Sequence, residues 1–271
     1  MKLFASDLDG TLLNQYHKAD DTINEGIKKI QASGHIFSIC TGRNPALASS
    51  AGLVPSYMIC MNGACILDPK GELLMQHPMD REVLRFLLQE PSLKFEYQTL
   101  TNIYTTRDRD SFTEIYRQNQ LLRHRDVKKD MEKNLKKYTF DCDPEWILNQ
   151  TIYKVNLHYA NSMEPKQVER LVHEHQDTII NAPSTESLAE LTGKEVTKAN
   201  AIRELAQFLH IDSNDIYVYG DGLNDISMLE AFQHSYSPCN GNEKAKKAAH
   251  SLLGPFEEYS VIKHMLETIQ E

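Results

Sequence analysis

This sequence lacks the patterns that mark membrane-spanning, secreted and thiolate-metal proteins. None of its 271 residues belongs to an apolar run of about 18, the length that a membrane-spanning helix needs. Its first residues do not form a signal peptide, so we expect the protein to act in the cytoplasm. The five cysteines are an odd number without a C-x-x-C pair, which favours small buried thiols in a reducing compartment over a disulfide or zinc framework.

The charge balance limits the partners of the protein. A net charge of −9 argues against a surface that coats nucleic acid, and we expect neither a nucleic-acid nor a membrane partner. Hydrophobic residues make up 41% and charged residues 25%, as in ordinary globular proteins. A chain of this length can form one large or two medium domains, and we expect a monomer or a weak dimer.

Three common ligand-binding motifs fail on spacing. An EF-hand loop starting at Asp7 would need glycine at its sixth position, where Leu12 stands. A P-loop ending at Gly193 and Lys194 would need glycine in place of Leu188. No G-x-G-x-x-G follows a predicted strand, so the dinucleotide-binding fingerprint is absent.

The most informative stretch that is present lies at residues 2–11, KLFASDLDGT. Its apolar residues 3–5 predict a buried strand. Asp7 and Asp9 follow two residues apart, so in an extended chain their side chains reach the same small volume. Two full charges about 4 Å apart repel by about 4 kcal/mol at an effective dielectric of about 20, so a cation or a proton is needed between them. Gly10 then allows the chain to turn away at once.

Strands and helices alternate through the first part of the chain and again through the last. Such alternation is typical of a parallel sheet with crossover helices. The predicted strands are residues 3–5, 36–40, 57–61 and 216–219, with a weak strand near Tyr236 and a hairpin at 65–67 and 72–74. The predicted helices are residues 22–33, 46–51, 195–209, 226–232 and 258–269.

From about residue 80 the rhythm changes to a mixture of helices and short β-like runs. We therefore predict a Rossmann-like parallel-sheet core formed by residues 1–79 and 188–271, with an α+β cap domain inserted at residues 80–187. The cap contains a charged stretch, residues 123–138. Its acids are interleaved with its bases, which favours a solvated helix over a basic recognition surface.

Polar side chains follow four of the predicted strands. They are Asp7 with Asp9, Thr41, Asn62, and the group Asp221, Asn224 and Asp225. In an open parallel sheet the carboxyl ends of the strands line one crevice, where ligands bind. Asp7, Asp9 and Asp221 then offer oxygen ligands to one hard cation, and Mg²⁺ prefers a few carboxylates together with water and phosphate oxygens.

A metal-bridged carboxylate beside a hydroxyl and a lysine suits phosphoryl transfer. An aspartate can attack phosphorus and form an aspartyl-phosphate, which splits one difficult displacement into two. A metal and a lysine neutralise the charge on the equatorial oxygens, and backbone N–H groups hold the phosphoryl group in line. A second acid two residues further on can protonate the leaving oxygen and later activate water.

Four segments resemble, in order, the motifs of the haloacid dehalogenase-like phosphatase superfamily. They are DLDGT at residues 7–11, TGR at 41–43, VTKANA at 196–201 with Lys198, and GDGLND at 220–225. The large insertion after the third predicted strand resembles the Cof-type branch, and so does Asn240 in the segment CNG at residues 239–241. The resemblance implies a Mg²⁺-dependent phosphatase that hydrolyses small phosphomonoesters, such as sugar phosphates or similar metabolites, through an aspartyl-phosphate intermediate.

The resemblance also implies a role for each matched residue. Asp7 would be the nucleophile and a Mg²⁺ ligand, and Asp9 the general acid and base, binding the metal through its backbone carbonyl. Asp221 would be the third protein ligand, and Asp225 would support the site without binding the metal. Lys198 would be catalytic. The residues expected to bind the transferring phosphate are Leu8 through its backbone, Thr41, Gly42, Lys198 and Asn224.

Two other interpretations of the activity remain open. A phosphomutase of the same superfamily would return the phosphoryl group to its substrate, and a phospho-metabolite-binding regulator would have lost catalysis. A lysine near a helix start, such as Lys198, is usually solvated, and its rival Lys194 lies only four residues away. Ala199 and Cys239 stand where this branch usually has glycine. Neither departure affects the expected chemistry, but the local backbone at these two positions can differ from the branch pattern. The charges and aromatic residues of the cap do not identify the substrate.

Overall fold

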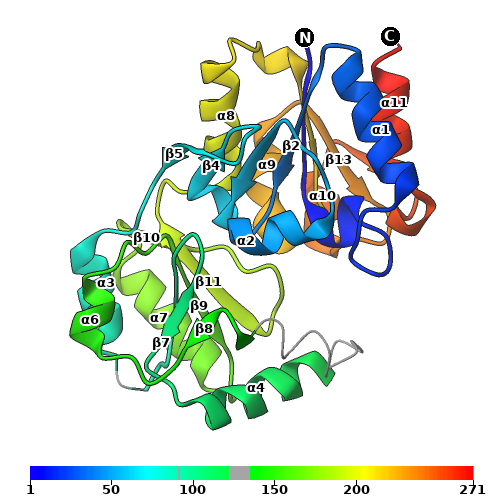
Figure 1. The fold of residues 1–271 in the computed structure, drawn as a ribbon. Coiled ribbons are helices and arrows are strands. Elements are labelled where there is room, and N and C mark those ends of the chain that lie inside the picture. Colours follow the sequence, from blue (N-terminus) through cyan, green and yellow to red (C-terminus); the bar gives the residue numbers. More distant parts are fainter. Residues whose placement is uncertain (91, 122–134, 271) are drawn as a thin grey trace. The chain divides into compact units, whose positions relative to one another are not determined.

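The computed structural model describes residues 1–90, 92–121 and 135–270, and the chain forms two compact units (Figure 1). One unit comprises Met1–His77 and Val196–Glu271, and the other comprises Pro78–Glu195. The first unit is thus assembled from both ends of the chain, and we call it the core unit. The second is inserted into it, and we call it the inserted unit. None of the helices in the described ranges has both the length and the apolar character needed to cross a membrane.

A largely parallel sheet organises the core unit. Its strands are β1 (Leu3–Ser6), β2 (Ile36–Cys40), β3 (Tyr57–Cys60), β4 (Cys65–Leu67), β5 (Leu73–Gln76), β12 (Ile216–Tyr219), β13 (His234–Pro238) and β14 (Ser251–Leu253). They lie in the order β14-β13-β12-β1-β2-β3-β4-β5, and every pair from β14 to β3 is parallel. β4 and β5 extend one edge as an antiparallel hairpin.

Helices cover both faces of this sheet, as Figure 1 shows. They are α1 (Asp21–Ala32), α2 (Pro45–Ala48), α8 (Lys198–Phe208), α9 (Ile226–Ala231), α10 (Glu243–Ala248) and α11 (Ser260–Thr268). On one face α1 and α11 pack with Phe4 and Phe37, and on the other face α8, α9 and α10 pack with Leu3 and Ala5. Because side chains alternate along a strand, β1 contributes to two separate apolar cores and is buried on both faces.

The inserted unit contains its own six-stranded sheet. Its elements are α3 (Arg81–Leu88), β6 (Glu96–Gln98), β7 (Ile103–Thr105), α4 (Arg109–Leu121), β8 (Tyr138–Thr139), α6 (Pro144–Leu148), β9 (Lys154–His158), α7 (Glu164–Glu174), β10 (Ile179–Asn181) and β11 (Leu188–Gly193). The strand order is β10-β11-β9-β6-β7-β8, and among the described strand pairs of this second sheet only β7–β8 is parallel.

The two faces of this second sheet differ in polarity. One face packs its apolar side chains under α3, α6 and α7. On the other face β9 presents Lys154, Asn156 and His158, which are largely buried. The Lys154 Nζ donates to Glu190 Oε1 of β11 at 2.7 Å, and His158 Nδ1 lies 2.6 Å from Glu96 Oε1 of β6. The buried charges of this face are therefore compensated in pairs.

The predicted fold class, a parallel α/β core interrupted by an α+β insertion, is confirmed. The predicted boundaries need correction. Leu188–Gly193 were assigned to the core, but they form β11 and pair with β9 and β10, so the core unit resumes only at Val196. The first boundary moves from between 79 and 80 to between 77 and 78. Most of the charged stretch at 123–138 lies outside the described residues; Tyr138 begins β8.

Candidate active site

The candidate site lies at the carboxyl ends of neighbouring strands in the core unit. β1 lies between β2 and β12, and it is followed directly by Asp7. The Asp7 backbone N–H donates to the Tyr219 carbonyl at 2.9 Å, which extends the β1–β12 pairing by one residue. β12 leads into the turn that carries Asp221, and β2 leads into Thr41. The sheet thus brings residues from the two ends of the chain together.

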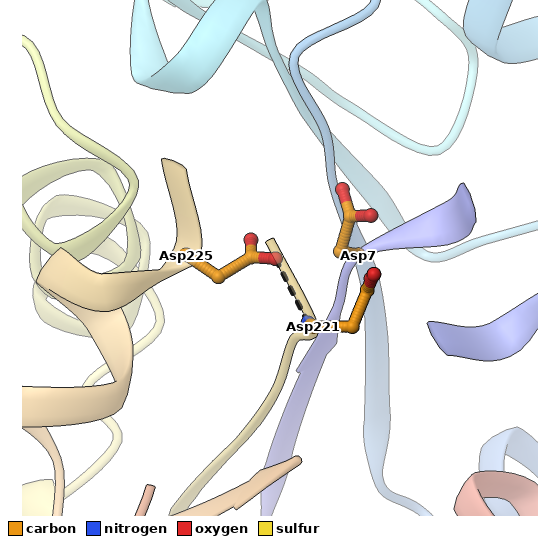
Figure 2. A group of neighbouring side chains, drawn as sticks. All are labelled: Asp7, Asp221 and Asp225. Atoms are coloured by element: carbon orange, nitrogen blue, oxygen red, sulfur yellow. Dashed lines mark hydrogen bonds between the residues drawn. The ribbon is translucent and has the colours of Figure 1, made fainter. Parts of the chain in front are cut away.

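Figure 2 shows three aspartates, Asp7, Asp221 and Asp225, that share one small volume. Each offers one carboxylate oxygen, and these oxygens lie within 4.8 Å of one another. Asp7 is 8% exposed and Asp225 is fully buried, so water screens their charges poorly. Three carboxylates in this environment need compensating positive charge.

Lys198 supplies part of that charge. Its Nζ donates to Asp7 Oδ1 at 2.8 Å and to Asp225 Oδ1 at 2.5 Å, and its side chain is fully buried. Lys198 is the first residue of α8, whose start is fixed by Thr197, since the Thr197 hydroxyl accepts from the Asn200 N–H at 3.1 Å. The predicted helix start at residue 195 was therefore three residues too early.

Asp225 fixes the turn around Asp221. Its Oδ2 accepts from the backbone N–H groups of Asp221 at 3.0 Å and Gly222 at 2.8 Å, and its Oδ1 accepts from Lys198. Both oxygens of Asp225 are therefore engaged by protein donors. This arrangement leaves Asp7 and Asp221 as the two carboxylates better able to bind a cation.

The electrostatics of Asp7 and Asp221 also point to a cation. Burial raises the pKa of Asp7 to about 7, with Asp225 and Asp9 adding to the effect and Lys198 opposing it. Burial, together with Asp225 and Asp7, raises the pKa of Asp221 to about 8, although the Thr11 hydroxyl donates to its Oδ1 at 2.6 Å. If all three carboxylates are ionised, one lysine leaves an excess of two negative charges.

A divalent cation would balance this excess. The donor set consists of carboxylate oxygens, which suits a hard cation such as Mg²⁺. Gly10 shapes the same volume, because its φ is +79° and a Cβ there would lie 2.4 Å from Asp221 Oδ2. Glycine at this position is therefore required both by the backbone conformation and by the space that Asp221 occupies.

Asp9 has different surroundings, outside the group of three carboxylates. Arg43 Nε donates to its Oδ2 at 2.8 Å, Arg43 Nη2 donates to its Oδ1 at 2.5 Å, and His17 Nδ1 lies 2.7 Å from Oδ1. Burial, the largest influence, acts to raise the pKa of Asp9. The His17 hydrogen bond and the Arg43 guanidinium outweigh it and hold the pKa well below its usual range. Asp9 is therefore a carboxylate at neutral pH in this state.

The predicted phosphate-binding residues follow the ends of β1, β2 and β12, and Lys198 begins α8. Thr41 is buried, and its Oγ1 accepts from the Arg43 N–H at 3.2 Å. Asn224 Nδ2 donates to Asn62 Oδ1 at 3.0 Å, which joins the turn after β12 to the turn after β3. Leu8 directly follows Asp7, and Gly42 directly follows Thr41.

The structure distinguishes Lys198 from its rival Lys194, and it adds Arg43 and His17 to the residues of the candidate site. Lys194 belongs to the inserted unit, and its Nζ lies 3.4 Å from Asp177. Arg43 stands in the TGR segment, but the sequence indicated no role for its side chain. His17 belongs to none of the four motifs, and no pattern in the sequence singled it out. Its contact with Asp9 depends on a turn that is visible only in the structure.

Comparison with known proteins gives a consistent result. The sequence model of the haloacid dehalogenase-like hydrolase family matches residues 4–265 of this chain. Phosphatase YwpJ of Bacillus subtilis is 26% identical over 98% of this chain and 100% of its own length. The 5-amino-6-(5-phospho-D-ribitylamino)uracil phosphatase YwtE of the same organism is 25% identical over 92% of this chain and 91% of its own.

A solved structure agrees over the whole fold. A haloacid dehalogenase-like hydrolase from B. subtilis superposes with a TM-score of 0.84 at 25% identity, covering 98% of this chain and 99% of that one. The resemblance drawn from the four motifs is confirmed by these matches.

Proposed function

This chain belongs to the haloacid dehalogenase-like hydrolase family, whose curated relatives include named phosphatases, and on that premise we propose that it hydrolyses small phosphomonoesters with Mg²⁺ through an aspartyl-phosphate. The observation that carries the proposal is the contact of Asp7 with Lys198 beside Asp221. It joins a nucleophile, a buried positive charge and a second carboxylate that could share a cation.

In the proposed reaction an Asp7 carboxylate oxygen attacks phosphorus and the bond from phosphorus to the leaving oxygen breaks. Asp9 gives a proton to that leaving oxygen. Water then attacks the aspartyl-phosphate, Asp9 takes a proton from the water, and Asp7 is released with inorganic phosphate. Lys198 holds Asp7 and offers positive charge to the phosphoryl oxygens, while Thr41, Gly42, Asn224 and the Leu8 backbone orient the group.

A bound Mg²⁺ would neutralise charge on the phosphoryl group and keep Asp7 ionised. Asp7, Asp221 and the Asp9 backbone carbonyl would hold it, and Asp225 would keep the Asp221 turn in place. Two observations support a cation at these residues: the excess of two negative charges when the three carboxylates are ionised, and the raised pKa values of Asp7 and Asp221. Lys198 alone does not compensate the three carboxylates.

The low pKa of Asp9 favours one half of the reaction. As a carboxylate it is ready to accept a proton from the attacking water. Donation to a poor leaving group requires Asp9 to be protonated once substrate is bound. We therefore expect the first half of the reaction to be sensitive to the leaving group.

We also propose that the inserted unit selects the substrate, because it carries none of the four motifs. A relative is named for a phosphorylated ribitylamino compound, which supports phosphorylated sugars or similar metabolites as the substrate class.

All five cysteines are free thiols, which supports action in the reducing cytoplasm.

The direct test is an assay for free phosphate from a panel of phosphorylated metabolites and p-nitrophenyl phosphate. Activity should require Mg²⁺, disappear in excess EDTA, and recover poorly with Ca²⁺, which takes more ligands at longer distances. Undiminished activity in EDTA would contradict the metal dependence. Release of an isomeric phosphate ester in place of free phosphate would identify a phosphomutase, and binding without turnover would identify a regulator.

A further inference from the structure

His17 contacts Asp9 although it lies outside the four motifs. Its Nδ1 is 2.7 Å from Asp9 Oδ1. A carboxylate accepts hydrogen bonds and cannot donate them, so the hydrogen in this contact belongs to His17 Nδ1. The side chain of His17 is 39% exposed, so the contact is made at the rim of the site and not in the apolar core.

The two oxygens of Asp9 are not equivalent. Oδ1 accepts from both His17 Nδ1 and Arg43 Nη2, whereas Oδ2 accepts from Arg43 Nε alone among the described residues. Oδ2 therefore retains more capacity for a further hydrogen. The donors from His17 and Arg43 together hold the plane of the Asp9 carboxylate.

The backbone at His17 is held in an unusual conformation. Its φ is +57°, in the left-handed region that residues other than glycine rarely adopt. Asn14 stabilises the turn: its carbonyl accepts from the His17 N–H at 2.9 Å, and its side-chain oxygen accepts from the N–H groups of Tyr16 and Lys18. Strained residues of this kind persist where the surroundings enforce them, and they cluster at functional sites.

We propose that His17 is a positioning residue for proton transfer: by donating to Asp9 Oδ1 it leaves Oδ2 to carry the proton. This inference rests on the proposed function, in which the proton moves from Asp9 to the leaving oxygen as the phosphorus–oxygen bond breaks. His17 itself neither binds the phosphoryl group nor exchanges the proton. Its removal should therefore matter most where the leaving group needs the proton most.

The test compares kcat/KM for an alkyl ester, glycerol 2-phosphate, with kcat/KM for p-nitrophenyl phosphate, whose leaving group needs little protonation. kcat/KM reports the steps up to departure of the leaving group and does not include the later hydrolysis. Proton transfer contributes about 10² to 10⁴ in rate, so we expect His17→Gly to lower the alkyl value about tenfold or more and the aryl value less than about threefold. Asp9→Asn should show the same pattern with a larger loss.

Glycine is chosen for the deletion because it accepts positive φ without strain. His210 provides the matched control: it is an exposed histidine of the core unit with a φ of +54°, and His210→Gly should leave the ratio of alkyl to aryl activity unchanged. His17→Asn should restore much of the ratio, because its amide can donate near the position of Nδ1 and asparagine tolerates this backbone conformation.

The inference would be overturned if His17→Gly left the ratio of alkyl to aryl kcat/KM unchanged, whether both values fell equally or neither fell. It would also be overturned if His17→Asn restored none of that ratio. If the wild-type protein hydrolyses neither ester and no metabolite of the panel, the proposed function fails and the inference fails with it. Wild-type activity with an unchanged ratio in His17→Gly would instead reject the role of His17 and leave the proposed function intact.

Discussion

At the scale of single residues, the site places like charges together where stability would favour their separation. One carboxylate oxygen from each of Asp7, Asp221 and Asp225 lies within 4.8 Å of the others, and Lys198 is buried against Asp7 and Asp225. The raised pKa values of Asp7 and Asp221 show that the folded chain without a cation favours protonated carboxyl groups there. This is an arrangement in which folding stability is reduced for the benefit of binding.

Asp221→Asn should therefore stabilise the metal-free protein. The folded-state pKa of Asp221 is raised to about 8 from 3.8, so the contribution of this group to stability is full below about pH 4 and is lost as the pH rises towards 8. The amide has no charge to lose and keeps an oxygen for the Thr11 hydroxyl. The gain in unfolding free energy should be about 2 kcal/mol larger at pH 8 than at pH 5, after allowance for partial solvent access.

Urea unfolding in EDTA at both pH values measures this difference. Glu25→Gln, at an exposed position on α1, is the control for removing one negative charge. A variant that is less stable than wild type at pH 8, or whose gain does not change with pH, would contradict the electrostatic account of the site.

At the scale of elements, the sequence predicted the parts of the site that depend on local pattern. Asp7, Thr41 and Asp221 stand within two residues of the ends of short apolar runs, and these runs form β1, β2 and β12 with ends close to those predicted. Lys198 was identified by resemblance, and the buried contacts that distinguish it from Lys194 come from tertiary packing. His17 was missed because its contact arises from a left-handed turn that has no periodic signature.

The second domain boundary was missed for a related reason. Residues 189–192 of this segment alternate apolar and polar side chains, which would suit a strand in either unit. Their assignment depends on distant partners: Leu191 pairs with Val155, and Glu190 accepts from the buried Lys154. Strand pairing between distant residues is invisible to a window along the chain.

The boundary leads to a test with two chain fragments. A fragment of residues 78–195 should unfold cooperatively, since it contains all six strands of its sheet and its own apolar core. A fragment of residues 80–187 lacks β11 and leaves Lys154 without Glu190, and losing one partner of a buried ion pair costs about 3 to 5 kcal/mol. Thermal unfolding followed by circular dichroism compares them. A shorter fragment as stable as the longer one would refute the placement of β11.

At the scale of the whole molecule, the residues to which we assign catalytic roles come from one unit that the chain leaves and re-enters. Asp7 and Asp9 precede the insertion, and Lys198, Asp221 and Asp225 follow it. The core unit could therefore keep the proposed chemistry while the inserted sequence varies. The central claim is that Asp7, and not Asp9, carries the phosphoryl group.

The most direct measurement is the site of the covalent intermediate. The full-length protein with Mg²⁺ is quenched in acid during turnover of a phosphomonoester labelled in its phosphoryl group, digested, and mapped by mass spectrometry. We expect the label on Asp7, no label in Asp7→Asn, and more label retained in Asp9→Asn with a good leaving group, because hydrolysis of the intermediate needs Asp9 as base. Label on Asp9, or a kcat near wild type for Asp7→Asn, would contradict the account.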